Sequence, residues 1–451
     1  MLRIAGRPAA IAVLAMAASL AFGRTSSLMQ TPATPAIRLD VSHYAASIEP
    51  NLSQQSIAGT VEIDFTAETA GQTIEFDSGA LTVDSVREGS AGLVFEKQGS
   101  RLRITLARPA IAGESRAIRV QYHGMPRRGI QFDPGGTFVF TSFSTSQWLV
   151  CVDAPSDKAT LDLELILPPA LSAVANGRQT GRRALPDGRV AIMWQERDAM
   201  PSYTFGFAAG TMTETTEPAS GGRAPVRTLG AGFSTDELRQ VFPSTGDALE
   251  FFERRAGVPY RGNVYTQVLA GTGIGQEMAD FAVFPASYGR GVLSAGGGGT
   301  LGAHELAHQW WGNLVTCRDW THMWLNEGFA TFMAAAYTEQ HLGREAYERQ
   351  IEDSHQRYQA VRDRGHDRAL VFSEWNAPSA DDRTIVYHKG AYVLFLLRRE
   401  LGDDVFWSAI REYTRRYAGQ SVETIDFQRA VERTSGRSLS EFFETWVYSG
   451  R

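Results

Sequence analysis

Two histidines and a glutamate in the second half of the chain have the residue types and spacing of a metal site. His304 and His308 are four residues apart, so on one helix they share a face and can bind one ion. Glu305 points about 100° away from His304, because a helix has 3.6 residues per turn. Glu305 can therefore reach a water molecule at the metal without being a ligand itself.

We expect the third ligand to be Glu327, which follows His308 with 18 residues between them. A catalytic zinc ion takes three protein ligands and keeps one position open for water. A structural zinc ion is instead closed by four ligands that are usually thiolates, and the chain has only 2 cysteines. His304, His308 and Glu327 therefore predict one catalytic Zn2+ ion.

The residues around these ligands, 304–316 (HELAHQWWGNLVT) and 324–330 (WLNEGFA), resemble the gluzincin aminopeptidases, which include aminopeptidase N and leukotriene hydrolase. The spacing between the two stretches is also that of the family. Residues 151–160, 258–260 and 438–448 extend the resemblance over nearly all of the chain beyond its N-terminal segment, although Ala154 stands where the family has Glu. The match is to a short form that lacks the large C-terminal helical domain of many members.

The resemblance implies a zinc aminopeptidase that hydrolyses the N-terminal peptide bond of peptides. Glu305 would act as the general base that takes a proton from the attacking water. The family also has a tyrosine in a Tyr-x-Lys-Gly pattern, and residues 387–390 (YHKG) fit it. The phenol of Tyr387 would donate a hydrogen bond to the oxyanion that forms during the reaction.

Substrate-binding residues also follow from the resemblance. In the family a Gly-x-Met-Glu-Asn stretch supplies a glutamate that pairs with the free N-terminal ammonium, and the corresponding residues 274–278 read IGQEM. Glu277 is preserved, and Gly275 belongs to the same stretch, but the changed neighbours leave the shape of the first specificity pocket undefined. Gln131 is a further candidate, matched to a glutamine of the β domain. The expected partners are peptides with a free N-terminus.

Three other functions stay open from the sequence. An endopeptidase could use the same metal site, and an epoxide hydrolase could act on the same zinc. A catalytically inactive peptide-binding module is the non-enzyme alternative. Such a module would normally lose a ligand, the base or the tyrosine, and all of these are present in this chain.

The elements that must position these residues fall into two parts. Residues 36–215 alternate between apolar and polar side chains, which predicts an all-β domain, with Tyr203, Phe205 and Phe207 in its last strand. Residues 216–225 read as a linker. Residues 226–451 are expected to be mainly helical, with helices near 246–255, 302–313, 327–341, 387–401 and 406–417 and an extended stretch near 264–269. The predicted fold is α+β and multidomain, and the resemblance implies a saddle-like β domain followed by a thermolysin-like catalytic domain.

The N-terminus predicts export. Arg3 and Arg7 precede an apolar run over residues 9–22 and then small residues, which is the order of a signal peptide over residues 1–23. We therefore expect a periplasmic or extracellular protein, with an uncleaved signal anchor as the alternative and no later membrane span. The net charge of -6 gives no sign of a nucleic-acid partner. Cys151 and Cys317 are expected to be buried free thiols, although one bridge between them stays open.

Overall fold

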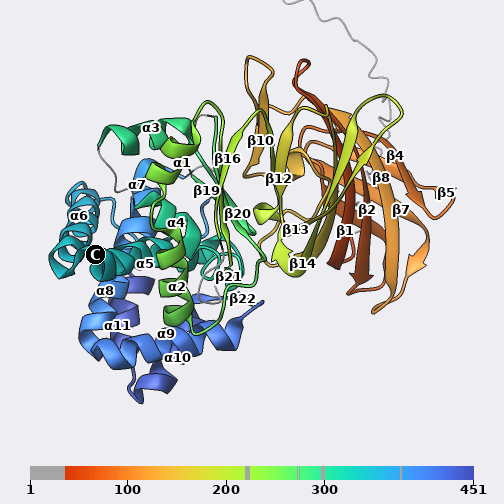
Figure 1. The fold of residues 1–451 in the computed structure, drawn as a ribbon. Helices are drawn as coiled ribbons and strands as arrows, with labels where there is room; N and C mark the ends of the chain where they lie inside the picture. The colour runs from red at the N-terminus through yellow and green to blue at the C-terminus, as the bar shows by residue number, and fades with distance from the viewer. Residues whose placement is uncertain are drawn as a thin grey trace, which may run out of the picture. The chain divides into compact units, whose positions relative to one another are not determined.

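The computed structural model describes residues 36–218, 224–271, 273, 275–295, 300–375 and 378–450. The predicted signal peptide over residues 1–23 lies outside this part of the chain. Residues 36–451 form one compact unit, in which a β domain is followed by a mixed, largely helical domain (Figure 1). The predicted α+β fold with an N-terminal β domain is thereby confirmed.

The β domain is built on an eight-stranded sheet. Its order is β13-β14-β11-β1-β2-β8-β4-β5, with β1 Leu39–Asn51, β2 Ser56–Ala67, β4 Thr82–Glu88, β5 Ala91–Gly92, β8 Ser115–Gly124, β11 Lys158–Leu167, β13 Arg178–Ala184 and β14 Val190–Pro201. β1 pairs with β2 in antiparallel fashion and with β11 in parallel. Alternate residues such as Val61, Ile63 and Phe65 are fully buried, because one face of the sheet covers the core of the domain.

Two smaller sheets complete the β domain. One has the order β3-β7-β6 (Gly71–Asp77, Arg101–Ala110, Val94–Gln98), and the other β12-β15-β10-β9 (Ser172–Ala175, Phe207–Gly210, Phe138–Ser142, Gly129–Phe132). The expected last strand is wrong in part, because Tyr203 lies in a 3-10 turn, η2 (Ser202–Thr204), and the strand begins only at Phe207. Tyr203, Phe205 and Phe207 are all buried, and so are the neighbouring Ser202 and Thr204, so the alternation of side-chain type does not follow an alternation of burial.

The second part begins with a five-stranded sheet of order β16-β17-β18-β20-β19. Its strands are β16 Thr213–Glu217, β17 Val226–Gly230, β18 Tyr265–Leu269, β20 Phe281–Phe284 and β19 Gln276–Met278. β16 contains Thr216 and Glu217, the first two residues of the predicted linker, and it pairs with β17. The short strand β19 pairs only with β20 and places Glu277 opposite Ala282.

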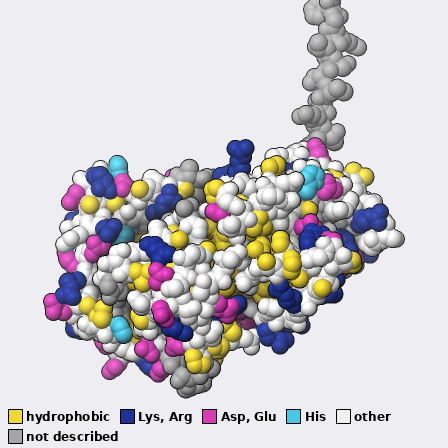
Figure 2. Space-filling view, turned by 45° about the horizontal axis from the view of Figure 1, so that its top comes forward, with side chains coloured by type: hydrophobic (Ala, Val, Ile, Leu, Met, Phe, Trp, Pro, Cys, Tyr) yellow, Lys and Arg dark blue, Asp and Glu magenta, His cyan; other side chains and the backbone are white. Residues whose placement is uncertain are grey.

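Helices make up most of the remainder. They are α1 Thr235–Val241, α2 Thr245–Ala256, α3 Ala286–Ser294, α4 Leu301–Ala307, α5 Trp324–Leu342, α6 Arg344–Asp363, α7 Ala380–Thr384, α8 Gly390–Leu401, α9 Asp403–Tyr417, α10 Thr424–Ser435 and α11 Ser440–Phe443, with π-helical turns η4 Ile385–Lys389 and η5 Glu444–Tyr448. Helix α5 is buried over most of its length and lies among the other helices (Figure 1). Within the described ranges, every helix is too short or too polar to cross a membrane. Acidic and basic side chains are mixed over the visible surface (Figure 2).

Candidate metal centre

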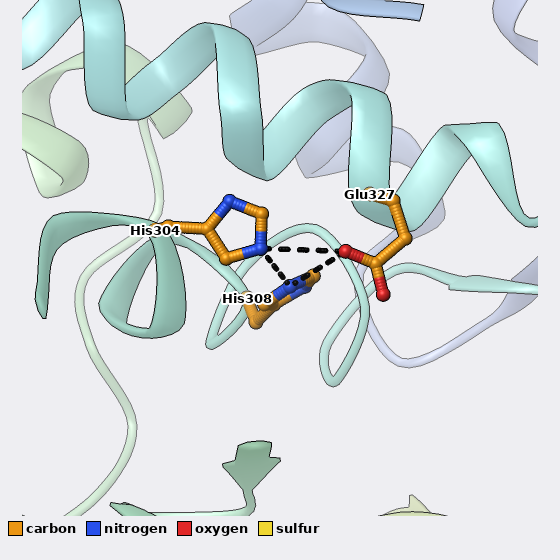
Figure 3. A group of neighbouring side chains, drawn as sticks. All are labelled: His304, His308 and Glu327. Atoms are coloured by element: carbon orange, nitrogen blue, oxygen red, sulfur yellow. Dashed lines mark hydrogen bonds and ion pairs between the residues drawn. The ribbon is translucent and has the colours of Figure 1, made fainter. Parts of the chain in front are cut away.

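Helices α4 and α5 bring the three predicted ligands together. His304 lies on α4, His308 is the C-cap residue that follows this helix, and Glu327 lies in the first turn of α5. Their side chains converge on one point (Figure 3). The His304 and His308 Nε2 atoms are 3.1 Å apart, and Oε2 of Glu327 lies 3.3 Å from the first and 3.4 Å from the second.

These distances fit a zinc ion. Zinc at 2.0–2.1 Å from each ligand in a tetrahedral arrangement requires ligand atoms about 3.3 Å apart. The Nδ1 atom of His308 is 3.0 Å from the carbonyl oxygen of Trp311, so this nitrogen donates a hydrogen and Nε2 keeps its lone pair for a metal. Two imidazole nitrogens and a carboxylate oxygen that face one another need a cation between them. His304, His308 and Glu327 thus form a site for one zinc ion.

The chain turns sharply after His308, which corrects the predicted helix over residues 302–313. Helix α4 ends at Ala307, and the backbone nitrogen of Asn313 donates to the His308 carbonyl at 2.9 Å. Gly312 has a φ of 138°, and a Cβ atom there would lie 2.9 Å from Nδ1 of His308. Only glycine therefore allows the turn to pass this close to the ligand.

Glu305 lies beside the metal ligands and is only 3% exposed. Its carboxylate, that of Glu277 and the His308 ring each place one atom within 4.8 Å of the others. Burial raises the pKa of Glu305 well above its ordinary value, while the His308 ring opposes this and the carboxylates of Glu277 and Glu327 add to it. Glu305 thus lies beside the metal ligands, as predicted from the sequence, while its role as the general base stays a prediction.

Gly275 and Glu277 lie close to the side chain of Glu305. A Cβ atom at Gly275 would lie 2.4 Å from Oε1 of Glu305, so the chain leading into β19 passes directly over the base. Glu277 is 7% exposed. Burial raises its pKa to about 7, and among its neighbours His308 lowers the pKa while Glu327 raises it. Such a carboxylate gains from a cationic partner close to the metal.

Tyr387 reaches the site from the π-helical turn η4. Its ring stacks on His304 with centroids 5.8 Å apart and planes at 8°. Burial raises the pKa of its phenol, with further contributions from Glu327, Glu277 and Glu305, so the phenol keeps its proton and can donate it in a hydrogen bond. A Cβ atom at Gly328 would lie 2.9 Å from the Cα atom of Gly390, which shows how closely α5 and the start of α8 approach beside this turn.

Gln131 lies on β9 of the β domain. Its Nε2 atom donates to Oγ of Ser142 at 3.1 Å. The next residue, Phe143, donates its backbone N–H to Oε1 of Gln276 at 2.6 Å, and Gln276 precedes Glu277. Gln131 is thus joined to the strand of Glu277 through the hairpin of β9 and β10, while its contact with substrate stays a prediction.

The β domain supplies residues that the sequence did not reveal. The hydroxyl of Tyr203 donates to the carbonyl of Gly312 at 3.0 Å and accepts from Nδ2 of Asn326 at 3.0 Å. The two partners of Tyr203 are 109 and 123 positions away from it in the sequence, so no local sequence pattern could predict these contacts. Cys151 and Cys317 are both buried and free, as the sequence favoured.

Comparisons with known proteins agree with this geometry. The family model described as "Peptidase family M1 domain" matches residues 300–446, and "Peptidase M1 N-terminal domain" matches residues 41–204. An M1 zinc metallopeptidase from Deinococcus radiodurans has a crystal structure with a TM-score of 0.79 and 25% identity, which covers 92% of this chain and 94% of that one. A two-domain M1 zinc metallopeptidase mutant bound to L-arginine has a TM-score of 0.78 and 25% identity, with coverages of 92% and 95%.

Longer curated relatives match over part of their length. Aminopeptidase M1 of Arabidopsis thaliana is 27% identical over 310 residues, which are 66% of this chain and 35% of that protein. Aminopeptidase M1-C of Oryza sativa subsp. japonica is 35% identical over 147 residues, which are 32% of this chain and 17% of that protein. The chain therefore spans about a third or less of the length of these two relatives.

Proposed function

Because the chain belongs to peptidase family M1, we propose that it is a zinc aminopeptidase that removes the N-terminal residue of peptides. The observation that carries the proposal is the buried carboxylate of Glu277 next to the zinc site. A substrate ammonium bound there places the first peptide bond of the substrate at the metal. Relatives named aminopeptidases, and an M1 relative with bound L-arginine, support this reading.

The positions of the side chains support the following catalytic roles. His304, His308 and Glu327 would hold a zinc ion, which when bound would supply Lewis-acid chemistry at the scissile carbonyl and lower the pKa of water. Glu305 takes the proton from the attacking water and returns it to the leaving amine. Tyr387, stacked on His304, donates a hydrogen bond to the oxygen on which negative charge develops.

Glu277 and Gly275 set the register of the substrate. Glu277 binds the ammonium through a charge-assisted hydrogen bond, so a peptide with a blocked terminus loses its anchor. Gly275 keeps the space beside Glu305 free, because any larger residue would push on the base. Gln131 would contribute a polar group from the β domain to substrate binding. An inactive binding module is disfavoured, since it has no need to keep a buried carboxylate and a phenol beside the metal.

We also propose that the protein acts outside the cytoplasm. The support is the order of residues 1–23, a basic end followed by a short apolar run and small residues. Fractionation of cells that express the full chain, followed by mass determination of its N-terminus, tests this. A mature protein that starts shortly after residue 23 in an exported fraction is the expected result, and full-length protein retained in the cytoplasm contradicts it.

A matched set of substrates tests the activity. We expect aminoacyl chromogenic substrates to be cleaved when the amine is free and to resist cleavage when the same amine is acetylated. A zinc chelator should abolish turnover, and added zinc should restore it. Equal cleavage of free and acetylated substrates would instead indicate an endopeptidase, and turnover of an epoxide without peptide hydrolysis would indicate an epoxide hydrolase.

The variant Glu277→Gln sharpens the same test. Because a hydrogen bond between charged groups contributes roughly 1.5–3 kcal/mol, we expect kcat/KM for free-amine substrates to fall about 100-fold. Zinc content should stay at one ion per chain. The matched control is Glu345→Gln, since the Glu345 side chain is 88% exposed on α6, and it should leave kcat/KM unchanged. An unchanged kcat/KM in Glu277→Gln would contradict the assigned amine site.

A further inference from the structure

Tyr203 of the β domain touches three separate segments of the catalytic domain. Its carbonyl oxygen accepts from Nε2 of Gln276 at 3.4 Å. Its hydroxyl donates to the carbonyl of Gly312 at 3.0 Å and accepts from Nδ2 of Asn326 at 3.0 Å. The side chain is 7% exposed, so water does not compete for these bonds.

Each segment that Tyr203 touches carries a residue of the active site. Gln276 precedes Glu277, and Asn326 precedes the zinc ligand Glu327. Gly312 lies in the turn that starts at His308, directly after Trp311, whose carbonyl accepts from the His308 ring. One hydroxyl therefore joins the turn after one zinc helix to the first turn of the other.

The neighbouring contacts make this connection rigid. The Tyr203 ring packs edge-on against Trp320 with centroids 5.2 Å apart, which fixes where the hydroxyl lies. Oδ1 of Asn326 accepts from the backbone nitrogen of Cys317 at 3.1 Å, so the amide of Asn326 is held at both of its ends. From the β domain, Nδ2 of Asn176 also donates to the carbonyl of Ala279 at 2.8 Å, just beyond β19.

We propose that Tyr203 is a positioning residue through which the β domain holds His308 and Glu327 at zinc-binding distance. The hydroxyl acts on the ligands from outside, through Gly312 and Asn326. Partners of this kind orient metal ligands, and their loss commonly weakens metal binding or activity 10- to 100-fold. The inference rests on the zinc site itself and does not depend on the proposed aminopeptidase activity.

The variant Tyr203→Phe tests the proposal, because it removes the hydroxyl and keeps the ring. We expect the zinc dissociation constant, measured by competition with a chelator on the full chain, to rise about 10- to 100-fold. Zinc release after addition of excess chelator should accelerate as well. Both readouts are independent of any substrate, so they separate this proposal from the proposed function.

Tyr122→Phe is the matched control. Tyr122 is 1% exposed, and its hydroxyl donates to the carbonyl of Trp148 at 3.1 Å within the core of the β domain. It makes the same kind of buried bond as Tyr203, but both partners belong to the β domain. We expect it to lower the thermal midpoint of unfolding and to leave zinc affinity unchanged. Equal zinc affinity in Tyr203→Phe, Tyr122→Phe and the parent protein would overturn the proposal.

Asn326→Ala gives a second route to the same answer. It removes the other side of the connection, and we expect zinc affinity to fall about tenfold or more. In the double variant, Tyr203→Phe should add little to Asn326→Ala, since both changes break one network. If Tyr203→Phe does not fold, Asn326→Ala still tests the proposal. Unchanged zinc affinity in Asn326→Ala would refute the proposed connection between Tyr203 and the zinc ligands. Fully additive losses in the double variant would also refute it.

Discussion

An ion pair of the β domain and one of the helical domain differ in how far their charges are buried. On the eight-stranded sheet, Glu62 and Arg119 form an ion pair at 2.8 Å whose side chains are 44% and 61% exposed. This pair lines an open hollow of about 580 Å³ on the polar face of the sheet. In the helical domain, Lys389 and Asp367 pair at 2.9 Å with both side chains 1% exposed. Buried charges are costly unless they are paired, so each partner of this buried pair depends on the other.

Two buried ionisable groups of the β domain, Glu196 and Lys158, lie at its border with the helical domain. Glu196 is 4% exposed, and burial raises its pKa to about 9, with the neighbouring carboxyl of Asp280 raising it further. Lys158 donates from Nζ to the carbonyls of Asn313 and Leu314 at 3.2 and 3.0 Å, and burial lowers its pKa to about 7. Asp280 follows β19, and Asn313 lies in the turn after His308. Both buried groups therefore lie against segments that are close in sequence to residues of the zinc site.

The largest effect should come from a buried charge next to the metal. In Glu305→Gln the base is lost while the shape of the side chain stays, and we expect kcat to fall about 10⁴-fold, the upper end of the range for one general base. Zinc content, measured by metal analysis, should stay at one ion per chain. The kcat of a chromogenic aminoacyl substrate checks the loss.

Glu62→Gln on the eight-stranded sheet is the control for this change. It also replaces a carboxylate with an amide, but at a side chain that is 44% exposed. We expect kcat and zinc content to match those of the parent protein. Comparable activity in Glu305→Gln and Glu62→Gln would break the contrast between the two domains and remove Glu305 from the mechanism.

The zinc site and most of the helices could be predicted from the sequence because their signals are local. His304 and His308 share a helical face by spacing alone, and the structure confirms the predicted metal site with Glu327. The helices α2, α5 and α9 lie where periodicity placed them. Helix α6, which has exposed polar residues over most of its length, was not predicted because its apolar face is narrow.

Connections between distant segments could not be predicted. The parallel pairing of β1 with β11 joins strands that are more than 100 residues apart. The alternation of apolar and polar residues predicts a strand but does not show which other strand it pairs with. Tyr203 looked like part of a strand, and its contact with Asn326 follows only from how the two domains pack. The turn after Ala307 also escaped prediction, since Trp310 and Trp311 continue an apolar pattern that fits a helix.

A large effect on stability should follow from breaking the buried ion pair. Lys389→Met leaves the carboxylate of Asp367 buried without its ammonium partner, and we expect about 3–5 kcal/mol less free energy of unfolding. Lys389 also donates to the carbonyl of Arg368 at 2.6 Å and ends the turn that carries Tyr387, so kcat should fall as well. Urea unfolding followed by circular dichroism measures the first effect.

A double variant separates charge from packing at this pair. In Lys389→Met with Asp367→Leu neither charge remains, and replacement of a buried ion pair by apolar residues is often close to neutral. We therefore expect the double variant to recover at least half of the lost free energy. If Lys389→Met costs less than about 1 kcal/mol, the pair does not hold this part of the helical domain.

The smallest effect should come from the ion pair on the sheet. Arg119→Ala removes the partner of Glu62, but both side chains are well exposed, and exposed pairs typically contribute about 0.2–1 kcal/mol. We expect urea unfolding to show a loss of about 0.5 kcal/mol or less, and high salt should reduce the difference further because it screens exposed charges. Zinc affinity and kcat should not change, since Arg119 pairs within the β domain alone. A loss above about 2 kcal/mol, or one that persists in high salt, would mean that the exposed pair stabilises the β domain as strongly as the buried pair stabilises the helical domain. The contrast between the two ion pairs would then fail.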